Sequence, residues 1–312
     1  MKKILGQFFT NPEIVKQAIN LIKNNGSILE PSAGDGAFSN LLNSKNKKVI
    51  SIEYDSYYAI KNEFINMDFF DYGLENRFDT IIGNPPYVKF SDINCKTLNL
   101  INKNFNDLFD KRSNLYLFFI YKSILHLNEF GELIFITPKD FFKSNSSKRL
   151  NKFIYDNGTI TDIIDFSDKK VFNDASVDTI LWRFEKSNFS RKTNINKTMK
   201  INNGNLFFVE RGINYNIKMS DIAYIKVGGV NGFDDAYENE FGVDFVCSYT
   251  NKTGKTKKLI YNKYDYCLDK YSQVLKTKHK KRDWWLWNRG CYISDDIRIY
   301  VNCKTRNKQP FF

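Results

Sequence analysis

The stretch Ile81-Ile82-Gly83-Asn84-Pro85-Pro86-Tyr87-Val88 decides how this sequence folds and where its chemistry lies. Its two isoleucines continue an apolar run typical of a strand that is covered on both faces. Gly83 permits a turn, and the two prolines then fix two successive φ angles and remove two backbone donors. The turn therefore offers carbonyl oxygens, the Asn84 side-chain oxygen and the flat ring of Tyr87. These groups suit a planar amine, although an ordinary turn beside a core tyrosine would contain the same residues.

Three earlier segments favour a ligand site over an ordinary turn. Residues 27–31 and 48–53 are expected to be short strands, and residues 64–70 contain a third strand end. Ligands of parallel α/β sheets bind at the carboxyl ends of the strands. Each polar residue at such an end is also explained by a strand cap or a solvated acid, but a succession of four indicates a site. The four are Glu30, Glu53, Asp68 and Asn84.

A glycine-rich turn, Ser32-Ala33-Gly34-Asp35-Gly36-Ala37-Phe38, follows the first of these strands. Strand, glycine turn and helix are the start of a nucleotide site in a doubly wound sheet. The acids Glu30 and Asp35 would repel a pyrophosphate, so a neutral or cationic ligand is favoured. Glu53 follows the turn by about 20 residues, where a carboxylate accepts ribose hydroxyls. Asp68 could then accept an adenine amine while Phe69 covers the ring.

Strands alternate with helical segments, which predicts an α/β fold. We expect a Rossmann-like, mostly parallel seven-stranded sheet with helices on both faces. Residues 115–127 have the pattern of an apolar helix, and residues 159–166 and 178–184 are expected to form the closing hairpin. Residues 90–112 are polar and rich in Asn and Lys, which is typical of a loop that could close over the site.

Composition limits the class of protein. The chain has 312 residues, of which 42% are hydrophobic, enough for a globular protein of two domains. No apolar run approaches the roughly 18–20 residues of a membrane span. The five cysteines are scattered without a Cys-x-x-Cys pair, and there are only two histidines, so no metal site is expected. The protein is expected to be cytoplasmic and reduced.

Positive charge is concentrated in the second part of the chain. Residues 1–184 contain 23 Lys and Arg against 22 Asp and Glu, whereas residues 185–312 contain 24 against 13. A lysine-rich genome or a need for solubility would enrich both parts alike. The asymmetry therefore favours a polyanionic partner, most simply nucleic acid.

The sequence suggests a catalytic domain at 1–186, a linker at 187–200, where apolar periodicity is lost, and a basic domain at 201–312. In the last domain, residues 276–282 form a basic run that leads into Trp284-Trp285-Leu286-Trp287. Such residues suit base stacking beside phosphate contacts, although the tryptophans could equally form the core of the small domain. The expected nucleic-acid contacts are Lys278, Lys280, Lys281, Arg282, Trp285 and Arg289.

Taken in order, these motifs resemble the gamma class of amino-type DNA methyltransferases, which methylate adenine N6 with S-adenosylmethionine. The resemblance covers residues 5–184 most closely. Residues 6–10 are similar to the N-terminal cofactor motif of that family, and residues 29–38 to its central cofactor loop. Asn84-Pro85-Pro86-Tyr87 matches its catalytic tetrad. Residues 171–181 resemble its late motif, in which Phe172 would pack on the target base.

The resemblance implies S-adenosylmethionine as cofactor and a role for each matching residue. Expected to bind the cofactor are Phe9, Thr10, Glu30, Ser32, Ala33, Gly34, Asp35, Gly36, Glu53, Asp68, Phe69 and Asn84. Expected to act on the adenine are Asn84, Pro85, Pro86, Tyr87 and Phe172. The Asn84 side-chain oxygen and the Pro85 carbonyl would accept the two N6 hydrogens of a flipped-out base. No metal and no dedicated general base are required.

The C-terminal part is similar to the target-recognition domains of bacterial restriction-modification methylases, notably at residues 227–232 and 287–306. Such chains usually continue beyond a sequence like Pro310-Phe311-Phe312, which suggests a recognition domain truncated at its C-terminus. The resemblance implies a monomeric, nucleoid-associated bacterial protein with double-stranded DNA and a cognate restriction endonuclease as partners. Three alternatives stay open: a methyltransferase of RNA or protein glutamine, a subunit of a larger restriction complex, and a non-catalytic DNA-binding relic.

Overall fold

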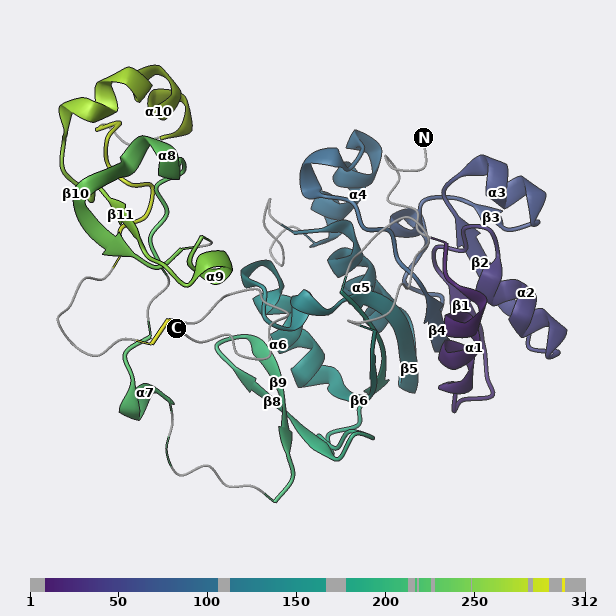
Figure 1. The fold of residues 1–312 in the computed structure, drawn as a ribbon. Helices are drawn as coiled ribbons and strands as arrows, with labels where there is room; N and C mark the ends of the chain where they lie inside the picture. The colour runs from purple at the N-terminus through teal and green to yellow at the C-terminus, as the bar shows by residue number, and fades with distance from the viewer. Residues whose placement is uncertain are drawn as a thin grey trace. The chain divides into compact units, whose positions relative to one another are not determined.

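The chain forms two compact units, residues 1–213 and 214–312 (Figure 1). The computed structural model describes residues 9–105, 113–166, 178–212, 217, 219–225, 228–247, 249–279, 283–291 and 299–300. Each unit has its own hydrophobic core, and each is described here by itself.

The first unit is built on a seven-stranded sheet in the order β3-β2-β1-β4-β5-β7-β6. The strands are β1 (Ile28–Glu30), β2 (Val49–Glu53), β3 (Ile65–Asn66), β4 (Phe78–Gly83), β5 (Leu127–Pro138), β6 (Gly158–Asp165) and β7 (Thr179–Lys186). Neighbours pair in parallel except at β7, which is antiparallel to both β5 and β6. The expected mostly parallel α/β sheet is therefore confirmed, including its closing hairpin.

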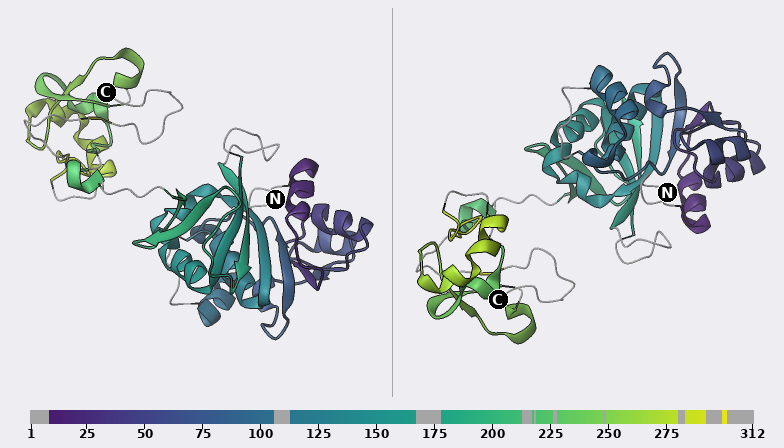
Figure 2. Two further views of the ribbon diagram at one scale, coloured as in Figure 1. Left: turned by 90° about the horizontal axis from the view of Figure 1, so that it is seen from below. Right: turned by 90° about the horizontal axis from the view of Figure 1, so that it is seen from above.

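Helices cover both faces of this sheet (Figure 2). The α-helices of the first unit are α1 (Pro12–Asn20), α2 (Ala37–Ser44), α3 (Ser56–Lys61), α4 (Cys95–Phe105), α5 (Leu115–His126) and α6 (Lys148–Asn157). Four short 3₁₀ turns join them: η1 (Phe69–Asp71), η2 (Phe90–Asp92), η3 (Lys139–Phe142) and η4 (Asn145–Ser147).

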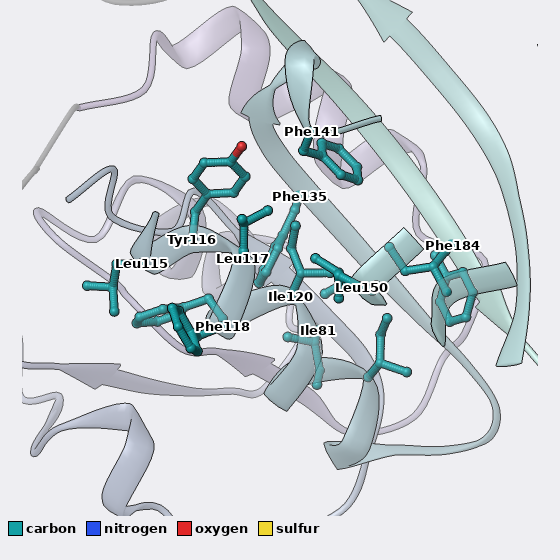
Figure 3. Packing of buried hydrophobic residues seen from close by; sticks show 14 of the residues in the cluster. Ile81, Leu115, Tyr116, Leu117, Phe118, Ile120, Phe135, Phe141, Leu150 and Phe184 are labelled. Carbon is teal, nitrogen blue, oxygen red and sulfur yellow. The ribbon is translucent and has the colours of Figure 1, made fainter. Parts of the chain in front are cut away.

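Consecutive strand residues point to opposite faces, and this alternation divides the core in two. Ile81 packs with residues of α4, α5 and α6, whereas the next residue, Ile82, packs with residues of α1 and α2. Leu133 and Ile134 of β5 are divided between the two faces in the same way. The α5 side of this core is the larger, and its side chains lie against the strands in Figure 3. A continuous apolar run in the sequence is thus a strand buried on both faces, as expected.

The prediction of a loop at residues 90–112 is wrong for most of that segment. Residues 95–105 form α4, and residues 90–92 form η2. Ile93, Ile101 and Phe105 are buried in the larger core, so the apolar residues of a polar segment lie on one side of the helix. The spacing of Ile101 and Phe105 at i and i+4 was the available signal, which the surrounding Asn and Lys residues obscured.

The boundary between the two units lies later than the sequence suggested. Strands β8 (Lys197–Asn202) and β9 (Asn205–Glu210) form an antiparallel hairpin within the first unit. Met199 and Leu206 are fully buried in its larger core, and Asn151 of α6 donates a hydrogen bond to the Gly204 carbonyl at 3.0 Å. Residues 187–200 are therefore no free linker, because the hairpin that they lead into packs within the first unit.

This boundary also changes the distribution of charge. Residues 1–213 contain 29 Lys and Arg against 24 Asp and Glu, and residues 214–312 contain 18 against 11. The positive excess is thus shared by the two units, because the segment around the β8–β9 hairpin is basic and belongs to the first.

The second unit contains only short elements around an aromatic core. They are α7 (Met219–Ile222), α8 (Asp234–Tyr237), β10 (Glu238–Phe245), α9 (Thr250–Thr253), β11 (Lys257–Leu259), η5 (Tyr266–Tyr271) and α10 (Ser272–Lys278). Trp287 is buried among Tyr237, Phe245 and Tyr261, and its indole nitrogen donates to the Ile260 carbonyl at 3.0 Å. In the part of the chain that the structure describes, no helix could cross a membrane.

A buried ion network holds the amino-terminal edge of the sheet. Arg183 of β7 is almost fully buried and contacts Glu132, Glu185 and Asp162. Glu132 also accepts hydrogen bonds from the Thr80 hydroxyl at 2.9 Å and from the backbone that follows α1. Removal of the Arg183 charge would leave the buried Glu132 carboxylate without a cationic partner.

We expect Arg183→Met to lower the free energy of unfolding by about 3–5 kcal/mol, because it leaves the Glu132 carboxylate uncompensated. Urea unfolding followed by circular dichroism measures this loss. The double variant with Glu132→Gln should regain part of it, as expected for a coupled pair. Lys152→Met, which removes an exposed pair with Asp156, is the matched control and should cost less than about 0.5 kcal/mol. A loss as small as that in Arg183→Met would contradict the role given to the network.

Candidate active site

A cavity lies at the carboxyl ends of β1 to β4. The strand order reverses between β1 and β4, which are neighbours in the sheet but far apart in sequence. Loops leave such a switch point in opposite directions and open a crevice between them, which is where α/β sheets bind ligands. Four polar side chains reach this cavity from successive strand ends: Glu30, Glu53, Asp68 and Asn84.

The glycine turn after β1 is held by hydrogen bonds to neighbouring strand ends. The Gly34 amide donates to Glu53 Oε2 at 2.7 Å, and the Ala33 amide donates to the Ile52 carbonyl at 2.9 Å. Gly34 has φ +56°, a left-handed conformation that favours glycine. Ser32 joins the turn to the next loop, because its hydroxyl donates to the Asn84 carbonyl at 3.2 Å.

Asn84 is oriented by the residue pair that precedes α1. Its amide nitrogen Nδ2 donates to the Thr10 hydroxyl at 3.2 Å. Asn11 caps α1 by accepting from the Glu13 amide at 2.9 Å, which fixes the position of the neighbouring Thr10. An amide whose nitrogen is directed to Thr10 has its oxygen directed to the other side. The N-terminal motif thus sets the orientation of the residue that follows β4.

Two buried carboxylates give the cavity a strong preference for positive charge. Glu30 is fully buried, and burial raises its pKa well above the ordinary value despite hydrogen bonds from Ser39 and Ser51. Burial also raises the pKa of Glu53, against the opposing effect of backbone N–H groups of Asp55 and Gly34. Among the described residues, Glu30 Oε1 has no hydrogen-bond partner. A cationic ligand, or one with N–H donors, would satisfy this atom.

Asp68 and Phe69 form the part of the wall that follows β3. Asp68 Oδ1 accepts from the Phe70 amide at 2.9 Å and begins the turn η1, while Oδ2 accepts from the Thr97 hydroxyl of α4. Phe69 stacks at 5.1 Å on Phe119 of α5. The two residues expected to contact adenine therefore lie in one wall of the cavity, together with Thr97 and Phe119, which the sequence did not suggest.

The tetrad residues differ in their access to the cavity. Asn84 and Pro86 line it, whereas Pro85 and Tyr87 do not. The Tyr87 hydroxyl donates to the Ile136 carbonyl at 3.0 Å, and its ring meets Tyr116 edge-on at 5.7 Å. These two contacts hold the ring of the half-buried Tyr87 in one place. Phe172 lies outside the described residues.

The structure brings together the residues for which the resemblance implied cofactor binding. All of them except Gly36 line the cavity: Phe9, Thr10, Glu30, Ser32, Ala33, Gly34, Asp35, Glu53, Asp68, Phe69 and Asn84. Gly36 has φ +86° at the start of α2, where a side chain would collide with Phe64, so its role is in the turn. Sequence reasoning missed the wall from η2, α4 and α5, which includes Ile93, Thr97, Leu115 and Phe119. The helical spacing of Leu115 and Phe119 was a signal for part of it.

The expected nucleic-acid residues are only partly within the described chain. Lys278 and Arg289 are exposed, and each donates a hydrogen bond to a backbone carbonyl, of Gly232 and Gly228 respectively. Trp285 is half-buried against Tyr264 and the second unit's core. Lys280, Lys281 and Arg282 lie outside the described residues. Among the residues that the structure covers, no cluster of His, Cys, Asp or Glu could hold a metal ion.

A mostly parallel seven-stranded sheet with an antiparallel β7 and an Asn-Pro-Pro-Tyr turn after β4 defines the class as the S-adenosylmethionine-dependent methyltransferases. Within that class, the chain belongs to the Eco57I restriction-modification methylase family, whose model matches residues 7–172. Its cofactor is S-adenosylmethionine, and Glu30, with its buried carboxylate oxygen and its raised pKa, fits a cationic ligand.

Curated relatives match between half and two thirds of this chain. The chain is 41% identical over 195 residues to the type II methyltransferase M.HincII of Haemophilus influenzae, covering 59% of this chain and 38% of the relative. It is 29% identical over 218 residues to the type II methyltransferase M.AccI of Acinetobacter calcoaceticus, covering 64% of this chain and 40% of the relative. The chain thus spans about two fifths of the length of these relatives.

Among solved structures, the methyltransferase subunit of a type I restriction-modification system from Streptococcus thermophilus is similar, with 17% identity and a TM-score of 0.48. That match covers 66% of this chain and 51% of the other.

We expect Glu30→Gln to weaken S-adenosylmethionine binding more than binding of S-adenosylhomocysteine, whose sulfur is uncharged. The loss should be about tenfold, or ~1.4 kcal/mol, because a full charge in the cavity wall is replaced by a neutral amide. In the wild type, the affinity for S-adenosylmethionine relative to S-adenosylhomocysteine should rise as the pH rises from 4.5 through the raised pKa of Glu30. Isothermal titration calorimetry across this pH range measures both affinities.

The same substitution should stabilise the ligand-free protein above pH 4.5. A carboxylate whose folded pKa is raised by burial loses stability as the pH rises through that pKa, and a neutral amide removes this loss. Glu129→Gln, at an exposed position on β5, is the control and should alter neither property. Equal weakening of both ligands in Glu30→Gln would rule out an electrostatic role for this carboxylate.

Proposed function

We propose that this chain contains the catalytic unit of a site-specific DNA methyltransferase that transfers a methyl group from S-adenosylmethionine to adenine N6. The single observation that carries the proposal is the position of Asn84, which opens onto the same cavity as Glu30, Glu53 and Asp68. An acceptor for an exocyclic amine therefore lies beside a site suited to a cationic nucleoside. Membership of a restriction-modification methylase family supports the same conclusion.

The proposed mechanism assigns each step to groups of this chain. S-adenosylmethionine supplies an electrophilic methyl group on a positively charged sulfur. The side-chain oxygen of Asn84 and the carbonyl of Pro85 accept the two N6 hydrogens, which draws the nitrogen lone pair out of the ring π-system. Thr10 holds the Asn84 amide in the orientation required for this contact. The additional proton on N6 leaves to solvent after transfer.

Adenine in a duplex cannot reach a cavity at the strand ends, so the base must be flipped out. Tyr87 and Phe172 would then hold it, and stacking on aromatic rings contributes about 1–3 kcal/mol per base. The bond from the Tyr87 hydroxyl to Ile136 fixes the tyrosine ring before the base arrives. Pre-positioning of this kind lowers the entropy lost on binding.

The second unit is proposed to recognise the DNA target. Its excess of Lys and Arg and its exposed Lys278 and Arg289 favour contact with a phosphate backbone. Lys280, Lys281, Arg282 and Trp285 remain predicted contacts. Double-stranded DNA is the proposed substrate of a monomeric bacterial protein that acts in the cytoplasm at the nucleoid, with a cognate restriction endonuclease as its partner in the system.

We expect the Asn84→Ala variant to lose methyl transfer by at least about 10²-fold, because it removes one of two preorganised acceptors. The measurement is incorporation of labelled methyl groups from S-adenosylmethionine into unmethylated bacterial DNA, followed by sequencing to map the modified base. Binding of S-adenosylhomocysteine should stay within about threefold of the wild type. Asn40→Ala, on the exposed surface of α2, is the control and should retain activity.

Two outcomes would count against the proposal. Nearly full turnover in Asn84→Ala would remove this residue from the chemistry. Label in RNA or in protein glutamine, with none in DNA, would keep the amine-acceptor geometry but change the substrate class. Label on adenine N6 within one short sequence would establish both the reaction and its specificity.

A further inference from the structure

Lys122 of α5 is a buried cation that the proposed chemistry does not use. Its side chain is 2% exposed, and its ammonium nitrogen donates to the carbonyls of Phe69 at 2.6 Å and Tyr72 at 2.7 Å. The same nitrogen lies 5.0 Å from the centre of the Phe69 ring and 5.9 Å from that of Phe70. Every one of these contacts is with η1 or the residue that directly follows it.

Burial of such a cation is unfavourable unless its contacts in the protein offset the free energy lost with its hydration. The nearby carboxylates Asp68, Asp71 and Glu75 favour the charged form of Lys122. Burial lowers the pKa of Lys122 to about 8, so the ammonium form still dominates at neutral pH. The two carbonyls that it binds belong to the first residue of η1, Phe69, and to the residue that follows the turn, Tyr72.

The turn that Lys122 holds is a wall of the cofactor cavity. Asp68, Phe69 and Phe70 all line the cavity, and Asp68 begins the turn by capping the Phe70 amide. Phe119 precedes Lys122 by one turn of α5, lines the same wall and stacks on Phe69. One helix therefore supplies both a part of the adenine-side wall and the cation that anchors the remainder.

We propose that Lys122 is a positioning residue of the cofactor site, which fixes the η1 backbone so that Asp68 and Phe69 are correctly placed for the adenine of S-adenosylmethionine. The inference rests on the cofactor assigned to this cavity. Thr97 secures the carboxylate of Asp68 from α4, whereas Lys122 secures the backbone behind it from α5. Without Lys122, the turn loses two charge-assisted hydrogen bonds and is free to move relative to the glycine turn on the far side of the cavity.

The test is Lys122→Met, which keeps the unbranched apolar part of the side chain and removes its donors. Isothermal titration calorimetry should show a dissociation constant for S-adenosylhomocysteine raised about tenfold, because a displaced η1 weakens the contact of Asp68 with the adenine by an amount typical of one hydrogen bond. Adenosine should show the same fold-change, because the altered contact is with the adenine. In methyl transfer, KM for S-adenosylmethionine should rise by a similar factor, while kcat at saturating cofactor stays within about twofold.

Leu150→Ala is the control for general loss of stability. Leu150 is fully buried in α6 and does not line the cavity, so this variant should lower the melting temperature without changing either dissociation constant. Lys122→Gln, which keeps an N–H donor on a shorter and uncharged side chain, should give an intermediate affinity and remains available if the methionine variant does not fold. Ser123→Ala tests the neighbouring buried position on α5 and should bind as the wild type does.

The outcomes separate this inference from the proposed function. Unchanged affinities in the folded Lys122 variants would overturn it, as would an equal loss of affinity in Leu150→Ala. Weakened binding in Lys122→Met, with no methyl transfer to DNA by the wild type, would support the inference and reject the proposed function. Failure of the wild type to bind S-adenosylhomocysteine would overturn both.

Discussion

The burial of both faces of one parallel sheet is the constraint from which the rest of the first unit follows. Ile81 and Ile82 must each meet a helix on their own face, and parallel neighbours can be joined only by connections that cross over the sheet. Strands joined in this way all end at the same edge. Residues from the ends of β1, β2, β3 and β4 therefore converge without any local signal that relates them to one another. The site is a consequence of the packing.

The buried carboxylates at the two edges of the sheet differ in whether the protein compensates their charge. At the amino-terminal edge, Glu132 is neutralised by Arg183 and receives further hydrogen bonds, which makes the network a structural support. At the carboxyl edge, Glu30 is equally buried, but burial raises its pKa well above the usual value, which means that its charge is not compensated within the protein. The Glu30 carboxylate therefore lowers the stability of the ligand-free protein, and a bound cationic ligand would restore it, as is common at functional sites.

The sequence allowed the sheet, the order of its motifs and most of the cavity's polar residues to be predicted. These inferences depended on local signals, namely apolar runs, a glycine turn and polar residues directly after strands. Helix α4 and the β8–β9 hairpin were missed because Asn and Lys residues surround their apolar positions, and only the folded chain shows that Ile101, Met199 and Leu206 are buried. Lys122 could not be recognised for a related reason. A lysine in an apolar helix gives no local indication of which backbone carbonyls it will meet.

The position of the β8–β9 hairpin alters how DNA binding should be understood under the proposed function. The sequence placed the positive excess in a separate recognition domain, but part of it belongs to the unit that contains the cavity. Of the three neighbouring tryptophans, Trp287 is a core residue, which is the structural alternative that the sequence left open. Under the proposed function, stacking on the flipped base would be a task of Tyr87 and Phe172, and phosphate contacts would come from cations of both units. A catalytic unit with its own basic hairpin would retain electrostatic attraction to the phosphate backbone. DNA affinity and catalysis would therefore depend in part on the same unit.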